Sequence, residues 1–177
     1  MRKFLFLPLL ALLASCGKNE DCDIVTPQPE DLVSPALYAT LSQSSTDPYN
    51  GPLEVLPCET NGSFYIGNYT AKGKQVRFPA YYLITNGIGK SQKYPLRLPV
   101  GTYNVIYWGY PDYFGTAGDA YLADPTLIIG KKLNTTSLGL RKIPGDTVYY
   151  PIHSLVYGTQ NINIGKDDLQ AHLRDIH

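Results

Sequence analysis

The chain has 177 residues with 15 basic and 15 acidic side chains, so its formal net charge is zero. No basic run is longer than Lys131-Lys132, which argues against the clustered positive charge with which proteins hold nucleic acid. The 15 tyrosines, 16 glycines and 14 prolines are typical of an exported protein rich in strands and turns.

The first sixteen residues predict a lipoprotein signal peptide. Arg2 and Lys3 precede an apolar run, Phe4–Leu13, that is too short to span a bilayer. Small residues then precede Cys16, whose thiol can take a diacylglycerol and whose amine, once freed by cleavage, can take a further acyl chain. We therefore expect residues 1–15 to be removed and acyl chains on Cys16 to hold the protein in a membrane. No second apolar stretch approaches membrane length.

Residues 16–36 are polar and broken by prolines, so we expect a lipidated, flexible tether. Lys18, Glu20 and Asp21 resemble the short signal that sends lipoproteins of the Bacteroidetes to the outer face of the outer membrane. The expected location is therefore the outer membrane, on the cell surface. Cys22 of the tether either pairs with Cys58 in an oxidising compartment or leaves two unpaired thiols.

From about residue 53, short runs of β-branched and aromatic residues alternate with turn residues. Tight turns are expected at Asn86-Gly87, Pro99-Val100-Gly101 and Pro144-Gly145-Asp146. Only Lys166–Ile176 has spacing compatible with a helix. The pattern predicts an all-β, immunoglobulin-like β-sandwich of about 7–9 strands over residues 37–177, ending in a frayed or truncated segment. The expected strands are Leu53–Leu56, Ser63–Tyr69, Gln75–Thr85, Tyr94–Leu98, Thr102–Tyr110, Leu127–Leu133, Ser137–Lys142, Thr147–Pro151 and Ser154–Ile164.

Residues suited to catalysis or metal binding do not form a recognised motif. His153, His172 and His177 have no metal-ligand spacing, and the last two fall in the expected frayed end. Serine-nucleophile and phosphate-binding motifs are absent from the sequence. We therefore expect no enzyme, no metal site and no cofactor.

Aromatic side chains are densest between residues 103 and 121. On a strand, Tyr103, Val105 and Tyr107 share one face, while Asn104, Ile106 and Trp108 share the other. We expect core positions for Tyr103, Val105, Tyr107 and Trp108. Three further aromatic residues follow, and for these both packing and contact with a ligand or partner remain open. They are Tyr110, Tyr113 and Phe114.

The tripeptide Asp146-Thr147-Val148 is similar to the site at which Bacteroidetes add O-glycans, which makes Thr147 a candidate. A plain turn leading into a strand explains the same three residues.

Three features together resemble one family. They are the lipidation cysteine with a second cysteine nearby, the stretch from Tyr94 to Gly109 with its Leu-Pro-Val-Gly-Thr-Tyr segment, and the stretch from His153 to Ile164. They are similar to the FimB/Mfa2 family of fimbrial subunits and anchors in Bacteroidetes. The resemblance implies a transthyretin-like β-sandwich and an outer-membrane lipoprotein that anchors or caps a fimbria without catalysis, joined to fimbrial subunits by strand complementation.

An alternative is a surface glycan- or protein-binding lipoprotein that uses the aromatic loop around Tyr110–Tyr121.

Overall fold

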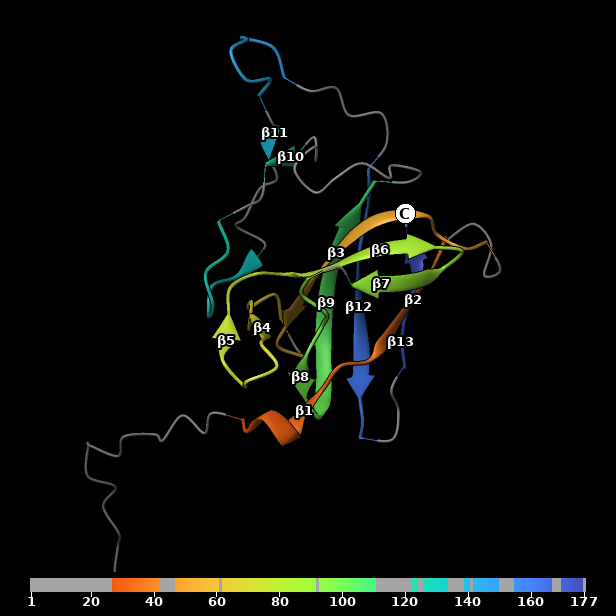
Figure 1. The fold of residues 1–177 in the computed structure, drawn as a ribbon, viewed down its shortest axis with the longest axis vertical. Coiled ribbons are helices and arrows are strands. Elements are labelled where there is room, and N and C mark those ends of the chain that lie inside the picture. Colours follow the sequence, from red (N-terminus) through yellow and green to blue (C-terminus); the bar gives the residue numbers. More distant parts are fainter. Residues whose placement is uncertain are drawn as a thin grey trace, which may run out of the picture.

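The regular structure is almost entirely β-strand in the computed structural model (Figure 1). The model describes residues 27–41, 47–60, 62–91, 93–110, 122–123, 126–133, 139–140, 142–149, 155–166 and 170–176. A short 3₁₀ turn, η1 (Pro29–Asp31), comes first. The strands are β1 (Leu32–Val33), β2 (Ala36–Leu41), β3 (Gly51–Cys58), β4 (Asn68–Tyr69), β5 (Gln75–Val76), β6 (Ala80–Thr85), β7 (Ile88–Ser91), β8 (Leu98–Pro99), β9 (Gly101–Gly109), β10 (Leu122–Ala123), β11 (Gly139–Leu140), β12 (Val156–Ile164) and β13 (Gln170–Ile176).

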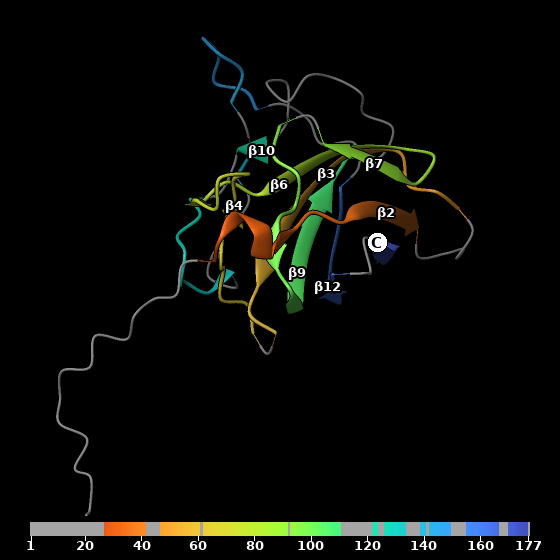
Figure 2. The same cartoon turned by 60° about the horizontal axis from the view of Figure 1, so that its bottom comes forward.

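Seven of these strands form one sheet in the order β12-β9-β3-β6-β7-β2-β13. Its ladders are antiparallel, except that β13 runs parallel to β2. The sheet curls until its first and last strands lie close together, as Figures 1 and 2 show. The remaining six strands form three short pairs, β1-β8, β4-β5 and β10-β11. This nearly closed arrangement agrees with the expected all-β sandwich.

The main core lies inside the curled sheet, and it is built by the alternation of side chains along each strand. Val105 and Tyr107 of β9 are buried in it, and Tyr103 packs against it. Ile106 and Trp108 lie in a separate cluster, which confirms the division of faces expected from the sequence. The buried members of the main core are Leu37, Ala39, Tyr49, Leu53, Val55, Ala80, Tyr82, Ile84, Leu96, Leu98, Val105, Tyr107, Val156, Ile162, Ile164, Ala171 and Leu173.

The second cluster covers the other face of β3 and β9. Leu56 and Cys58 of β3 meet Trp108 of β9 there, under Tyr65 and Leu127 from segments outside the large sheet. Because both faces are covered, β3 is buried along nearly its whole length. Central strands covered on two sides are the most apolar part of this sheet.

Two of the expected turns show why their residues are needed. Asn86 and Gly87 have φ values of 50° and 75°, the left-handed pair that a tight hairpin between β6 and β7 requires. In the Leu-Pro-Val-Gly-Thr-Tyr segment, the Tyr103 hydroxyl donates to the Pro99 carbonyl at 2.9 Å. A Cβ at Gly101 would lie 3.2 Å from that hydroxyl, so glycine leaves room for the ring. The Tyr103 side chain therefore stabilises the turn between β8 and β9.

Several expected elements differ from the structure. The spacing of Lys166–Ile176 is compatible with a helix, but Gln170–Ile176 forms the strand β13. The expected strand Leu127–Leu133 is wrong, since residues 126–133 form a turn with one isolated bridge, at Lys132. Strands β2 and β7 were not expected at all. Leu32 and Val33, in the stretch expected to be a tether, pair with Pro99 and Leu98.

Replacing Trp108 by Ala should lower the free energy of unfolding by about 3–5 kcal/mol, because Trp108 is 8% exposed and central to the second cluster. The matched control is Tyr157→Ala on the neighbouring strand. Tyr157 is paired in register with Trp108 but is 66% exposed, so its loss should cost less than about 1 kcal/mol. Chemical denaturation of both variants measures the difference. Equal losses would show that the second cluster contributes little to stability.

Candidate functional site

The two end strands of the large sheet, β12 and β13, lie side by side without a ladder between them. Five antiparallel pairings separate β12 from β2, and β13 follows β2 in parallel, so β12 and β13 run in opposite directions. Each strand pairs with a partner on one side only within the described residues. We call this junction the seam.

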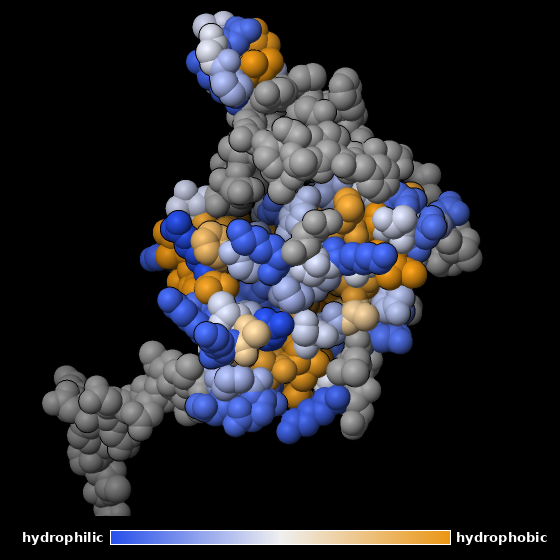
Figure 3. All heavy atoms as spheres, in the orientation of Figure 1, coloured by the Kyte–Doolittle hydropathy of each residue, from blue (hydrophilic) through white to orange (hydrophobic). Residues whose placement is uncertain are grey.

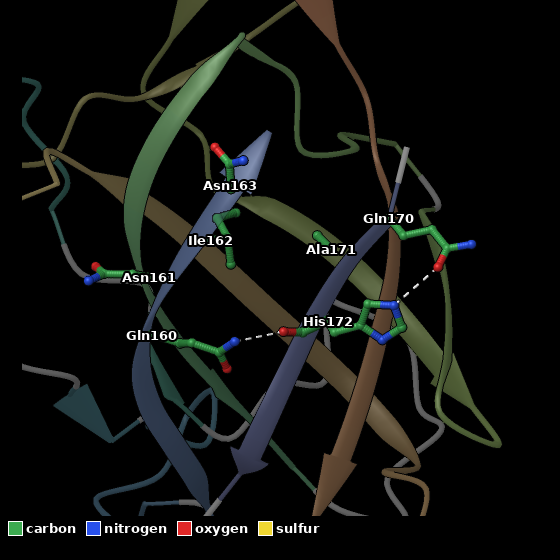
Figure 4. Close-up of a pocket in the computed structure, with 7 residues that line it drawn as sticks. All are labelled: Gln160, Asn161, Ile162, Asn163, Gln170, Ala171 and His172. Carbon is green, nitrogen blue, oxygen red and sulfur yellow. Dashed lines mark hydrogen bonds between the residues drawn. The ribbon is translucent and has the colours of Figure 1, made fainter. Parts of the chain in front are cut away.

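A groove of about 230 Å³ lies along the seam, and Figure 4 shows the residues that line it. Ile162 from β12 and Ala171 from β13 are buried members of the main core, so they form the apolar floor. The exposed side chains on the rim are polar: Asn161, Asn163, Gln170 and His172. The groove therefore has the alternating character of a sheet surface, with an apolar side and a polar side.

A side-chain hydrogen bond bridges the seam. The Gln160 amide of β12 donates to the His172 carbonyl oxygen of β13 at 2.8 Å (Figure 4). This contact uses a main-chain acceptor on the edge of β13, which a neighbouring strand would otherwise use. A side-chain amide therefore stands where a backbone ladder would complete the sheet.

The His172 ring fixes the other side of β13 against β2. It stacks on Tyr38 with ring centroids 4.8 Å apart, and its Nε2 lies 3.2 Å from Gln170 Oε1. Its partners are thus an aromatic ring and an amide, and no cluster of three metal-ligating side chains occurs among the described residues. The groove offers main-chain groups and amides, which suit recognition of another backbone.

Among the described residues that were singled out in the sequence, His172 lines the groove, whereas Tyr110, Cys58 and Thr147 do not. Tyr110 is 8% exposed, which leaves little of its ring for a ligand. His172 belongs to β13 and the groove, where a frayed end was expected. Six candidates fall outside the described residues: Cys16, Cys22, Tyr113, Phe114, His153 and His177.

Cys58 is buried in the second cluster, and its thiol donates to the Leu56 carbonyl at 3.7 Å. Burial, helped by the negative charge of Glu59, raises the pKa of the thiol to about 12. A thiol in this environment is a poor nucleophile at neutral pH. Because Cys22 lies outside the described residues, the pairing of Cys22 with Cys58 stays a prediction.

Thr147 lies on an exposed hairpin of residues 142–149, in which the Ile143 N–H donates to the Val148 carbonyl at 3.0 Å. The carboxylate of Asp146 accepts hydrogen bonds from the main-chain N–H groups of Thr147 and Val148, at 2.6 and 3.3 Å. The tripeptide is thus a turn capped by its own aspartate, with an accessible threonine.

The sequence did not identify four of the residues that line the groove, which are Gln160, Asn161, Asn163 and Gln170. The signal for the strand was present, because Asn and Ile alternate from residue 161 to 164. That alternation predicts one polar and one apolar face, but it does not indicate which edge of the strand lacks a partner.

Broad apolar patches are not seen on the face drawn in Figure 3, where the described hydrophobic residues form small groups between hydrophilic ones. Among the described residues, no helix is long and apolar enough to cross a membrane.

The comparison with protein families gives a match that covers most of the chain. The family model described as fimbrillin-A associated anchor proteins Mfa1 and Mfa2 matches residues 25–177. The searches of curated proteins and of solved structures return no match.

Proposed function

Because the chain belongs to the family of fimbrillin-A associated anchor proteins Mfa1 and Mfa2, we propose that it holds a fimbrial subunit through the seam between β12 and β13. In this proposal the protein is a non-catalytic outer-membrane lipoprotein that acts as an anchor, minor subunit or assembly component. The observation that carries the proposal is that the two end strands meet without a ladder. Unpaired strand edges are templates for another chain.

The chemistry of the groove supports strand addition as the mode of attachment. A strand entering the seam would be antiparallel to one edge and parallel to the other, because β12 and β13 run in opposite directions. Main-chain hydrogen bonds would give the affinity, and alternate side chains would give the specificity. Inward positions would meet Ile162 and Ala171, so they should be small and apolar. Outward positions would meet Asn161, Asn163 and His172, so they should be polar.

A bridging side chain supports the same mode of attachment. Without a bound partner, the Gln160 amide donates a hydrogen bond to the His172 carbonyl oxygen. An incoming strand would have to displace this contact. It would break one hydrogen bond and form several along the edge. The net contribution of one such bond is about 0.5–1.5 kcal/mol, so it is a modest barrier to entry.

Site-specific photocrosslinking in fimbriated cells tests this attachment. A photoreactive amino acid at Asn163, on the rim of the groove, should crosslink to a fimbrial subunit that mass spectrometry identifies. The control position is Ile128, which is 53% exposed and lies outside the groove. Equal crosslinking from Ile128, or no fimbrial product from Asn163 in cells that display fimbriae, would contradict attachment at the seam.

Lipidation of Cys16 is the second part of the proposal. The small residues before Cys16 and the apolar run of residues 4–13 support it. We expect Cys16→Ser to abolish labelling by an alkyne fatty acid and to mislocalise the protein. Cys22→Ser, six residues on, is the matched control and should keep the label. Labelling of the Cys16→Ser variant at the wild-type level would overturn the assignment.

Two modifications complete the proposal, and the intact mass of the mature protein tests both. Thr147 carries an O-glycan, supported by its exposure at the tip of the hairpin. Cys22 and Cys58 form a disulfide, supported by export to an oxidising compartment. Replacing Thr147 by Ala should remove the glycan mass. Alkylation of the unfolded protein without reduction should add no label, whereas modification of two thiols would exclude the disulfide.

A further inference from the structure

The basic side chains are unevenly distributed along the chain, although its formal net charge is zero. Between Thr60 and Pro111 the sequence contains no Asp or Glu. The basic residues of this stretch are Lys72, Lys74, Arg77, Lys90, Lys93 and Arg97. This part of the chain therefore carries an excess of positive charge that acidic residues elsewhere offset.

Two of these cations lie beside a pair of accessible aromatic rings. The rings of Phe78 and Tyr94 stack with centroids 5.5 Å apart and planes 17° from parallel. Phe78 is 47% exposed. The guanidinium carbon of Arg77 lies 5.9 Å from the centroid of Phe78, and Lys93 Nζ lies 5.4 Å from the centroid of Tyr94. We call these four residues the ring–cation patch.

The backbone beneath the patch is fixed by the folded core. Tyr65, which is fully buried, donates its hydroxyl to the Arg77 carbonyl at 3.0 Å. The N–H of Tyr81, on β6, donates to the Tyr94 carbonyl at 3.0 Å. The patch therefore joins the connection before β6 to the connection after β7 on a rigid support. A preorganised surface loses little conformational freedom when it binds a ligand.

The charges of the patch are available to a ligand. Arg97 differs, because its Nη1 donates to the Tyr69 carbonyl at 3.4 Å. Within the described part of the chain, neither Arg77 nor Lys93 forms an ion pair with a carboxylate. Their distances from the rings are near the outer limit of about 6 Å for a cation–π contact, so their N–H donors are free to turn toward an anion.

We propose that the ring–cation patch binds an acidic polysaccharide built from uronate sugars. The apolar face of a pyranose stacks on an aromatic ring, and a carboxylate pairs with guanidinium or ammonium. In the patch, Arg77 precedes Phe78 and Lys93 precedes Tyr94, so each aromatic ring has a cation beside it. The patch thus contains the same pair of ring and charge twice. A polyuronate repeats the same pair, because every sugar unit carries both a pyranose ring and a carboxylate. This site is separate from the seam, and its function does not depend on strand addition.

Calorimetric titration of the full chain in detergent with alginate oligosaccharides tests the proposal. Dextran oligosaccharides of equal length provide the neutral control ligand, and vesicles containing phosphatidylglycerol provide an anionic membrane. We expect binding of alginate but not of dextran or vesicles. The double variant Arg77→Gln/Lys93→Gln should lose about tenfold in affinity, and Phe78→Ala about three- to tenfold. Lys142→Gln, on the exposed hairpin of residues 142–149, should bind as the wild type does.

Each other outcome would overturn the proposal. Equal binding of dextran and alginate would show that the carboxylates are not recognised. Binding to vesicles without binding to alginate would identify a membrane-contacting surface instead. Loss in the charge variant with no loss in Phe78→Ala, or equal loss in Lys142→Gln, would reduce the interaction to ion exchange. Melting temperatures equal to that of the wild type show that the exposed variants remain folded.

Discussion

Closure of the large sheet around its core depends on how the backbone groups of its first and last strands are hydrogen-bonded where the two strands meet. A strand edge exposes N–H and C=O groups that must bond to another strand, to side chains or to water. In this chain the curl brings β12 against β13, yet the described residues form no ladder there. The Gln160 amide reaches the His172 carbonyl instead. Within the described residues, closure is therefore achieved by core packing and a side-chain contact in place of a backbone ladder.

Few described backbone bonds join β2, and β13 beyond it, to the rest of the large sheet. These two strands pair with each other over several residues, whereas the ladder from β2 to β7 has a single registered pair, Tyr38 with Ile88. One further bond, from the Ala39 N–H to the Gly87 carbonyl at 2.9 Å, supports that ladder. Buried side chains such as Leu37 and Leu173 hold the unit to the core. Local opening of a structure is cheapest where few backbone bonds must break.

The strands β9 and β3, which follow β12 in the order of the sheet, form its most rigid part. There β3 and β9 are covered on both faces, by the main core and by the cluster around Trp108. Under the proposed attachment, this firm part of the sheet would hold the edge of β12 in register before a fimbrial subunit binds. The ring–cation patch lies on the same framework, since the buried Tyr65 and the first part of β6 hold its backbone.

The sequence predicted the elements whose signals are local. The alternation along β9 separated Tyr107 from Trp108 correctly, and Asn86-Gly87 marked the hairpin between β6 and β7. The resemblance to fimbrial anchors is confirmed by the family model, which matches residues 25–177. The sequence could not predict β13 as a strand. Leu169, Leu173 and Ile176 have the i, i+4, i+7 spacing of a helix, whereas residues 169–173 also alternate between apolar and polar as in a strand. The parallel ladder with β2, more than a hundred residues away, decides for the strand.

The groove was unpredictable for the same reason. Alternation shows that Ile162 points to a core and that Asn163 does not, but the identity of the neighbouring strand is a property of the whole sheet. The ring–cation patch also joins segments that are separate in the sequence, Arg77 with Phe78 and Lys93 with Tyr94. Such pairs become visible only when the strands between them are in place.

Residue-resolved hydrogen–deuterium exchange of the full chain tests the open seam most directly. Residues 104–109 of β9 lie between two paired neighbours, so their amides should exchange slowly along this part of the strand. Along β12, which is paired with β9 from Val156 to Ile164, only alternate amides should be protected, because the others face the seam. Uniform protection of the β12 amides, and of Gln170 to Leu173 in β13, would mean that a backbone ladder closes the sheet. That result would contradict the account.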